Sequence, residues 1–251
     1  MVWTMVVHGG AGDLSAHLPE EEQRRLRDGL ALAVKRGSDV LATGGTALDA
    51  VSTAVRCLED NPLFNAGVGA VCNEDGTCEL DASIMSGVDR SCGAVGALRR
   101  VKNPIVVARA VMEKTPHVLL VGEGGDRFAL AQGVPPVEPA SLLTERRRTQ
   151  WERVRHADAT ALSRSEDTQG GGIDDDKSDL RGTVGAVALD SHGHLAAATS
   201  TGGLCNKRAG RVGDSGVIGA GTWASDETCA VSTTGSGELF QRHLAAHTVH
   251  A

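Results

Sequence analysis

The chain has 251 residues, of which 41% are hydrophobic, and a formal net charge of −7 at pH 7. This length allows one large domain with a sizeable core, and the acidic balance argues against nucleic acid or an anionic membrane as the main partner. We find neither the roughly 20 consecutive apolar residues of a membrane span nor the basic and apolar segments of a secretory signal, so we expect a cytoplasmic protein with no membrane partner.

The first quarter of the chain predicts a strand followed by two helices. Residues 4–7 form a short apolar strand that runs into the glycine cluster His8-Gly9-Gly10-Ala11-Gly12. This cluster either closes a tight turn or lets the backbone approach a ligand. Apolar residues at helical spacing predict helices over 19–37 and 46–60, the first with three glutamates where they complement the helix dipole.

An apolar loop follows the second helix. Pro62 stops that helix, and residues 58–69 then combine apolar side chains with two glycines. A loop this apolar must be buried, so its carbonyl groups need partners. Either a bound monovalent cation or ordered water would supply them.

The middle of the chain alternates strands and helices. Residues 70–73 and 77–85 predict a hairpin in which Cys72 and Cys78 face each other, as reduced thiols rather than a disulfide. Further strands are expected over 91–98 and 118–122, and helices over 104–112, 124–132 and 142–156. The last helix is strongly charged, which is typical of a solvated surface helix.

A linker separates this part from the C-terminal part. Residues 158–181 show no useful periodicity and are rich in Asp, Ser and Gly, which predicts a mobile segment, and such a length within one domain usually marks a functional or processed loop. After it we expect a hairpin over 183–189 and 195–201, a glycine-rich polar segment over 206–221, a strand over 228–233, a turn and a helix over 238–247. This order of elements predicts layered α/β packing.

A threonine stands at the start of the first strand after the linker. A threonine hydroxyl is a poor nucleophile until a base removes its proton, and a chain-terminal threonine carries that base as its own α-amine, with a pKa of about 8. Cleavage between Gly182 and Thr183 would create such a terminus, and a glycine there lets its carbonyl bend towards the hydroxyl for an N→O acyl shift. These residues alone are also compatible with an ordinary strand start.

Two other hydrolase classes lack their motifs. Ser236 does not lie in a Gly-x-Ser-x-Gly turn. His243 and His247 are four residues apart but lack the intervening glutamate of a zinc hydrolase.

Eight short blocks, spread over nearly the whole chain, carry a resemblance to a known family. They are His8-Gly9-Gly10-Ala11-Gly12, Gly45-Thr46-Ala47-Leu48-Asp49-Ala50-Val51, Pro62-Leu63-Phe64-Asn65-Ala66-Gly67, Glu79-Leu80-Asp81-Ala82, Gly182-Thr183-Val184-Gly185, Ala198-Thr199-Ser200-Thr201-Gly202-Gly203, Gly210-Arg211-Val212-Gly213-Asp214-Ser215 and Thr233-Thr234-Gly235-Ser236-Gly237-Glu238. In these blocks and their order, the sequence resembles the plant-type asparaginase/isoaspartyl peptidase family of N-terminal nucleophile (Ntn) hydrolases.

The resemblance implies a role for each matching position. Thr183 would be the nucleophile, exposed by self-cleavage after Gly182, and Thr201 would hydrogen-bond its hydroxyl. Arg211 would bind the substrate α-carboxylate, for which its planar fork of donors is suited. The other implied roles are those of Asp214 and the Gly237 carbonyl at the substrate α-ammonium, Thr234 and the Gly235 N–H in the oxyanion hole, Asn65 beside the nucleophile, and a sodium ion bound by the backbone carbonyls of Leu58, Glu59, Asn61, Phe64, Ala66 and Val68.

The resemblance also implies the fold, the assembly and the reaction. The fold would be a four-layer αββα sandwich of the α/β type, a single Ntn-hydrolase domain over 1–251. Self-cleavage would divide it into an α subunit, 1–182, with 158–182 as the mobile linker, and a β subunit, 183–251, assembled as an (αβ)2 homodimer. The enzyme would hydrolyse the side-chain amide of L-asparagine and of β-aspartyl (isoaspartyl) dipeptides through a β-aspartyl ester on Thr183, with no organic cofactor.

One departure from the family motivates two alternatives. The chain stops at Ala251, whereas members of the family continue for several dozen residues, so we expect a C-terminally truncated β subunit. An inactive remnant that acts only by association is one alternative. A glycosylasparaginase-like hydrolase is the other, and the lack of a secretory signal and of dense cysteine pairing argues against it.

Overall fold

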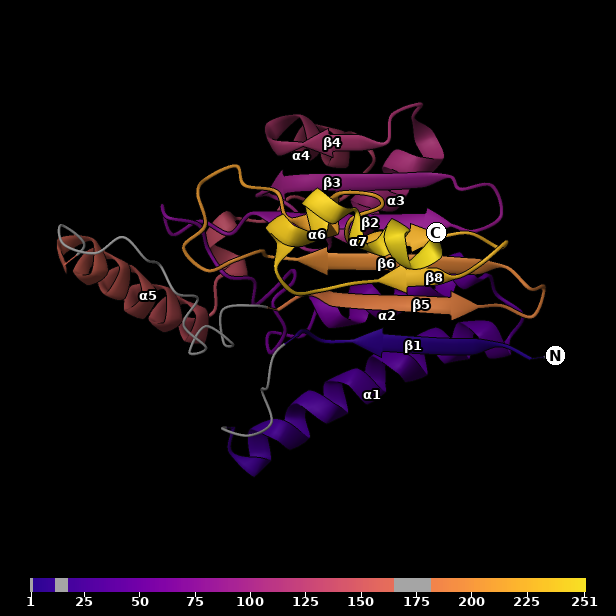
Figure 1. The fold of residues 1–251 in the computed structure, drawn as a ribbon, viewed down its shortest axis with the longest axis horizontal. Helices are drawn as coiled ribbons and strands as arrows, with labels where there is room; N and C mark the ends of the chain where they lie inside the picture. Colours follow the sequence, from indigo (N-terminus) through magenta and orange to yellow (C-terminus); the bar gives the residue numbers. More distant parts are fainter. Residues whose placement is uncertain (1, 12–17, 165–181) are drawn as a thin grey trace.

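A computed structural model describes residues 2–11, 18–164 and 182–251, with the backbone alone over 158–164. Its centre is a six-stranded sheet in the order β1-β5-β6-β2-β3-β4 (Figure 1). The strands are β1 (Thr4–His8), β5 (Val184–Leu189), β6 (Leu195–Thr201), β2 (Leu80–Ser86), β3 (Cys92–Leu98) and β4 (Leu119–Val121). The β3–β4 pair is parallel and the other neighbours are antiparallel. Strands from before and after the predicted linker therefore share one sheet.

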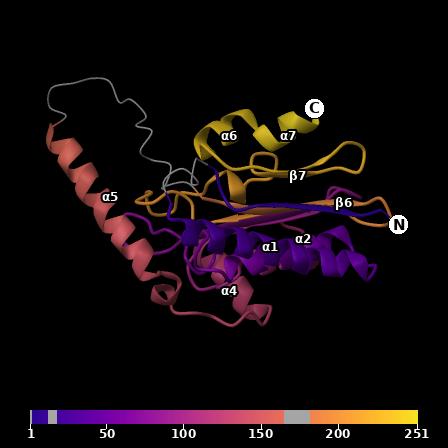
Figure 2. The same cartoon turned by 90° about the horizontal axis from the view of Figure 1, so that it is seen from below.

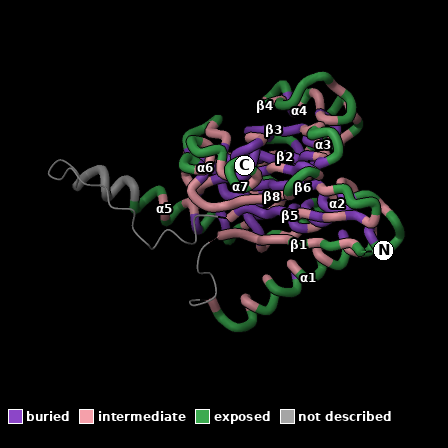
Figure 3. Tube along the Cα trace, turned by 45° about the vertical axis from the view of Figure 1, so that its right-hand side comes forward, coloured by how far each residue is buried: buried purple, intermediate pink, exposed green. Residues whose placement is uncertain are grey.

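Helices cover one face of this sheet. They are α1 (Glu20–Ala42), α2 (Ala47–Glu59), α3 (Pro104–Lys114) and α4 (Gly122–Ala131), of which Figure 2 labels α1, α2 and α4. Alternate strand residues point towards them, because successive side chains of a strand lie on opposite faces. These residues form the main hydrophobic core with the helices, among them Leu80, Ala82, Ile84, Val184, Ala186, Ala196 and Ala198. The buried residues concentrate in the sheet (Figure 3).

The other face of the sheet carries a second β layer. The strands β7 (Thr222–Ala224) and β8 (Ala230–Ser232) form a two-stranded sheet, and α6 (Gly237–His243) and α7 (Ala245–His250) lie beyond it (Figure 2). A short 3₁₀ helix, η3 (Asp214–Gly216), contacts the central sheet and α6. Helices, sheet, sheet and helices follow one another in space, which confirms the predicted αββα fold.

Hydroxyl groups bridge the two sheets. The ring Nε2 of His8 lies 2.9 Å from Ser232 Oγ, and Ser232 Oγ lies 2.7 Å from Thr199 Oγ1. Thr222 donates to Thr199 at 2.6 Å, and Ser83 donates to Thr222 at 2.7 Å. The chain of side chains reaches from β1 to β2, so the layers are joined by directional contacts as well as by packing.

The first helix extends further than the sequence indicated. We predicted its end at Gly37, but α1 continues to Ala42. A Cβ at Gly37 would lie 2.2 Å from Met5 Sδ and 3.0 Å from the Ala50 carbonyl oxygen. The glycine therefore allows α1 to approach β1 and α2 closely and does not end the helix.

The predicted hairpin over 70–85 is wrong in its first strand. Cys72 and Cys78 do face each other, in an isolated antiparallel bridge, and both are free thiols. The Asn73 side chain accepts two backbone N–H groups and closes the turn between them. The regular strand begins only at Leu80, where β2 pairs with β3 and β6.

The charged helix is longer than predicted. After a 3₁₀ turn, η1 (Pro139–Leu142), the helix α5 (Glu145–Arg164) projects from one end of the body (Figure 1). It includes 158–164, which we predicted as the start of the linker. The rest of that linker, 165–181, lies outside the described residues.

The C-terminal elements also differ in detail from the prediction. The strand β7 has no counterpart in the prediction, and the expected helix over 238–247 breaks at Leu244, whose φ is 45°. Beyond the break, the N–H groups of Ala246 and His247 bond to carbonyls in the loop before β7 and so redirect the chain. Across the described residues, no helix is both long and apolar enough to cross a membrane.

Candidate active site

Thr183 lies directly before β5, on the face of the sheet that looks towards the second layer. Its Oγ1 donates to the Oγ1 of Thr201, the last residue of β6, at 3.1 Å. Thr201 Oγ1 in turn donates to the Gly182 carbonyl oxygen at 2.9 Å and accepts the N–H of Gly203 at 2.9 Å. The predicted nucleophile and its predicted partner are thus in direct hydrogen-bond contact, and both are buried.

Asn65 holds the same carbonyl group from the other side. Its Nδ2 donates to the Gly182 oxygen at 2.8 Å and to the Gly203 oxygen at 2.9 Å, while its Oδ1 accepts the N–H of Val71. A Cβ at residue 182 would lie 2.9 Å from the Asn65 Cβ, so the close approach favours glycine. Two donors therefore polarise the carbonyl that precedes Thr183, which is the geometry that stabilises an oxyanion.

Arg211 and Asp214 lie beside the threonine pair. The Nε and Nη2 of Arg211 donate to Glu238 Oε1 at 2.9 and 2.8 Å. A Cβ at Gly237 would lie 2.7 Å from Arg211 Nη2 and 2.9 Å from Asp214 Oδ1. Cation and anion thus stand close together across a glycine, as predicted for residues that share one zwitterionic ligand.

One carboxylate oxygen of Asp214 is available to a cation. Its Oδ2 is buried and has no hydrogen-bond partner among the described residues. Burial raises the pKa of Asp214 to about 6, against the influence of Arg211. A buried carboxylate oxygen without a partner is costly, and an ammonium group in the cleft would remove that cost.

One cleft gathers most of the predicted site. It is lined by Gly182, Thr183, Thr201, Gly203, Leu204, Arg211, Asp214, Thr234, Gly235 and Gly237. Asn65 stands behind the Gly182 carbonyl. The structure therefore brings the predicted catalytic and substrate-binding residues together, and their individual roles stay predictions.

Of the six residues predicted to bind sodium, Leu58 and Glu59 end α2, and the loop that follows contains Asn61, Phe64, Ala66 and Val68. The carbonyls of Leu58, Glu59 and Asn61 accept backbone N–H groups of this loop. A carbonyl oxygen has a second lone pair, so these bonds leave room for a cation. The loop residues Phe64 and Ala66 are buried as well. A buried loop of backbone carbonyls fits a monovalent cation, and among the described residues no group of His, Cys, Asp and Glu side chains could hold another metal.

The side chain of Glu59 joins the end of α2 to β6. Its Oε1 accepts Ser200 Oγ at 2.7 Å and the N–H of Ile105 at 3.0 Å. Burial raises the pKa of Glu59 to about 8. Ser200 directly precedes Thr201 but its side chain faces α2, so this buried acid bonds β6 on the helix side of the sheet.

Comparison with known proteins identifies the family of the chain. The family model described as Asparaginase matches residues 1–251. The chain belongs to this family. An isoaspartyl peptidase of Escherichia coli (strain K12) is 46% identical over 98% of this chain and 75% of its own length. An isoaspartyl peptidase of Salmonella typhimurium is 48% identical over 98% of this chain and 77% of its own, and an isoaspartyl peptidase/L-asparaginase of Homo sapiens is 48% identical over 93% and 71%.

In this member of the asparaginase family, the N-terminal glycine cluster begins close to the nucleophile, because His8 pairs with Gly185 and its ring is near the Thr183 backbone. Gly9 and Gly10 line a separate apolar cleft with Phe64 and residues of α1. His8 bonds Ser232 between the sheets, and burial lowers the pKa of His8 to about 4, so its ring is neutral. A Cβ at Gly9 would lie 2.6 Å from Phe64 Cε1, so close packing requires a glycine there, and the tight turn and the approach to a ligand both stay predictions.

One polar residue of the site was missed in the family-based prediction. Glu238, at the start of α6, pairs with Arg211 although no role was assigned to it. Partial burial opposes its ionisation, but Arg211 outweighs burial and lowers the pKa of Glu238. Glu238 belongs to the last of the eight matching blocks, and this was the only signal for it in the sequence. Nothing in the sequence indicated that it pairs with Arg211, because the two are far apart along the chain.

Proposed function

We propose that the chain is a threonine amidohydrolase that cleaves the side-chain amide of L-asparagine and of β-aspartyl dipeptides. The observation that carries this proposal is the contact of Thr183 with Thr201 in the same cleft as Arg211 and Asp214. An L-aspartyl group has a carboxylate and an ammonium on its α-carbon, and Arg211 and Asp214 complement both. The names of the similar bacterial and human proteins, isoaspartyl peptidase and L-asparaginase, agree with that substrate class.

Activation would begin with attack of Thr183 Oγ1 on the carbonyl carbon of Gly182. Asn65 and Thr201 donate to that carbonyl oxygen and would stabilise the negative charge that develops on it. The peptide C–N bond then breaks as the ester C–O bond forms, and the hydroxyl proton goes to the amine. Water hydrolyses the ester, which leaves a carboxylate on Gly182 and a free α-amine on Thr183.

The α-amine of Thr183 would then act as the base for hydrolysis. It accepts the hydroxyl proton while Oγ1 attacks the side-chain amide carbon, and it passes the proton to the leaving nitrogen. Thr234 and the Gly235 N–H would stabilise the oxyanion, while Arg211, Asp214 and the Gly237 carbonyl hold the α-carbon. Ammonia leaves from asparagine, or an amino acid or peptide from an isoaspartyl bond. Water then cleaves the β-aspartyl ester and releases L-aspartate.

Three further features belong to this proposal. A structural sodium ion would bind the carbonyls of the 58–68 loop and stabilise the segment that carries Asn65, without taking part in a bond change. The steps above need no organic cofactor. We place the enzyme in the cytoplasm as an (αβ)2 homodimer of processed protomers, on the resemblance to the family and on the thiols of Cys72 and Cys78, which face each other without a disulfide.

The decisive test compares wild type with Thr183→Ala after purification. Denaturing electrophoresis should show two fragments for wild type, one of which begins at Thr183, and a single band for the variant. Wild type should release ammonia from L-asparagine and an amino acid from a β-aspartyl dipeptide. A wild-type chain that remains one band and releases neither product would rule the proposal out.

A further inference from the structure

The loop that presents Arg211 is tied at both ends to one strand. Glu79 directly precedes β2 and Asp81 belongs to it, so the two side chains lie on the same face. The N–H of Gly210 lies 2.9 Å from Glu79 Oε2, and the N–H of Gly213 lies 3.0 Å from Asp81 Oδ2. Arg211 lies between these two anchored amides. Two carboxylates of the central sheet therefore fix the backbone on either side of it.

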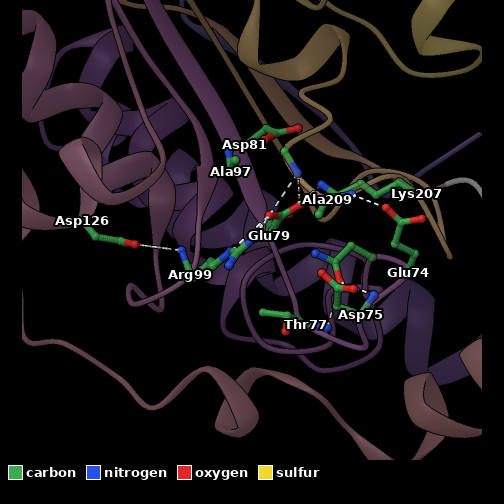
Figure 4. Close-up of polar contacts among 12 residues, drawn as sticks. Glu74, Asp75, Thr77, Glu79, Asp81, Ala97, Arg99, Asp126, Lys207 and Ala209 are labelled. Carbon is green, nitrogen blue, oxygen red and sulfur yellow. Dashed lines mark hydrogen bonds and ion pairs between the residues drawn. The ribbon is translucent and has the colours of Figure 1, made fainter.

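Both carboxylates are themselves held by other groups (Figure 4). Asp81 Oδ1 accepts the N–H of Ala97 at 2.8 Å, and Ala97 has a φ of 53°, next to a register shift between β2 and β3. Glu79 Oε1 accepts two N–H groups of the Arg99 side chain. The backbone N–H of Arg99 is in turn held by Asp126. Neither anchor can rotate without the loss of other bonds.

A buried cation completes the cluster. Lys207 is 5% exposed, and its Nζ donates to the Glu79 carbonyl oxygen at 2.9 Å. Burial lowers the pKa of Lys207, and the charges of Asp81 and Glu79 oppose that shift. Well-packed apolar residues often stabilise a fold as well as a buried ion network does. Stability alone therefore gives a weak reason for three buried charges, whereas the placement of a neighbouring group gives a specific one.

We propose that Glu79 and Asp81 are positioning residues for recognition of the substrate α-carboxylate. They hold the backbone at Gly210 and Gly213, and Glu238 holds the Nε and Nη2 edge of the Arg211 side chain. The guanidinium is thus oriented before the substrate arrives, which lowers the entropic cost of binding. This inference rests on the proposed function, in which Arg211 binds that carboxylate.

The test is Asp81→Asn, which keeps the shape of the side chain and removes one acceptor. A lost hydrogen bond to a charged group should raise the KM for L-asparagine and the inhibition constant of L-aspartate by about 10-fold, with kcat within about threefold. Inhibition by β-alanine, which is aspartate without its α-carboxylate, should change by less than about threefold. A purely structural role would not separate these two inhibitors.

Asp190, which directly follows β5, offers a matched control. Asp190 is also buried and also accepts backbone N–H groups, those of Ala47, His192 and His194, but it holds no part of the Arg211 loop. Asp190→Asn should reduce the melting temperature and leave the KM within about twofold of wild type. A KM change equal to that of Asp81→Asn would overturn the positioning role.

Two further variants keep the test decisive. If Asp81→Asn does not fold, Glu79→Gln takes its place: Gln keeps the length of the side chain but has one acceptor oxygen in place of the two that serve Gly210 and Arg99, so a raised KM at similar kcat is expected. In an Arg211→Lys background, either anchor variant should raise the KM further by less than about threefold, since the group they position is gone.

The outcomes separate the two proposals. A folded anchor variant with unchanged KM, or with reduced kcat at unchanged KM, overturns the positioning role and leaves the proposed function standing. If Arg211→Lys leaves the KM for asparagine unchanged, or if wild type hydrolyses no asparagine, the proposed function fails and the positioning role fails with it.

Discussion

The two faces of the central sheet differ in chemistry although the same strands supply both. Towards the helices, β2 presents Leu80 and Ile84, which belong to the main hydrophobic core. Towards the second layer it presents Asp81 and Ser83, whose partners are backbone amides and hydroxyl groups. The apolar cluster on that side is small, with Met85, Ala197 and Ala224 as its buried members.

This difference shows how one strand can serve stability and chemistry at once. The register places Asp81 opposite Thr201, and Thr201 contacts Thr183, so three polar side chains project from neighbouring positions across the sheet. The intervening residues, such as Ala82 and Ser200, face the helices. Substitutions one residue apart should therefore have very different consequences, and this contrast can be tested.

The largest effect is expected on the face towards the second layer. Thr201→Val removes the donor to the Gly182 carbonyl and the partner of Thr183 while it keeps the size of the side chain. Loss of one such donor should slow self-cleavage by about 100-fold or more. Its neighbour Ser200 faces the helices and bonds Glu59, so Ser200→Ala should keep the rate within about threefold. A time course of fragment formation checks both, and equal slowing would contradict the division between the faces.

Substitutions on the helix face of the sheet should lower the stability of the fold rather than the rate of self-cleavage. Ile84 is fully buried in the main core, and Ile84→Ala should lower the free energy of unfolding by about 2–5 kcal/mol. The adjacent Ser83→Ala removes hydroxyl bonds between the layers and should lower it by about 1 kcal/mol. Urea unfolding in the Thr183→Ala background, where the chain stays whole, measures both. A larger loss of free energy of unfolding for Ser83→Ala than for Ile84→Ala would contradict this prediction.

The charge on Asp214 should make ligand binding depend on pH. Its pKa is raised to about 6, so the carboxyl is protonated below that pH and cannot balance an ammonium group. The affinity for L-aspartate should fall by up to about 10-fold per pH unit below pH 6. Because the folded pKa is above the unfolded one, this group also makes stability fall as the pH rises towards 6. Titration calorimetry from pH 7 to pH 5 checks the binding, and a constant affinity would contradict it.

A comparatively small effect is expected from sodium. If the 58–68 loop binds the ion, sodium at ten times its dissociation constant should stabilise the fold by about 1.4 kcal/mol. The melting temperature should therefore be higher in sodium chloride than in choline chloride of equal ionic strength. Equal melting temperatures would exclude the sodium site.

Local patterns predicted most elements, and long-range contacts explain the errors. The strands β3, β5 and β6 were predicted close to their observed bounds, because a run of small apolar residues is a local signal. The helix through Gly37 could not be predicted, since the reason for that glycine is Met5 on another element. Likewise, residues 70–73 form no regular strand, and Asn73 makes an isolated bridge with Lys207, which is far along the chain.

The same distinction between local patterns and long-range contacts applies to the active site. The matching blocks were enough to predict that Thr183, Thr201 and Arg211 belong to one site. They did not indicate what holds those residues, because Glu79 and Gly210 are 131 positions apart and Arg211 and Glu238 are 27 apart. Residues that act can be recognised by type and spacing, whereas residues that support them become evident only once the chain is folded.

The strand order has a consequence for the refolding of the processed protein. Cleavage at Gly182 would leave β5 and β6 in one fragment, inserted between β1 and β2 of the other. Each fragment would then lack the neighbours that its strands require, so refolding would become a meeting of two molecules at a rate set by concentration. The mature enzyme would thus be assembled once, as a single chain, and afterwards be preserved by the slowness of its unfolding rather than by its ability to form again.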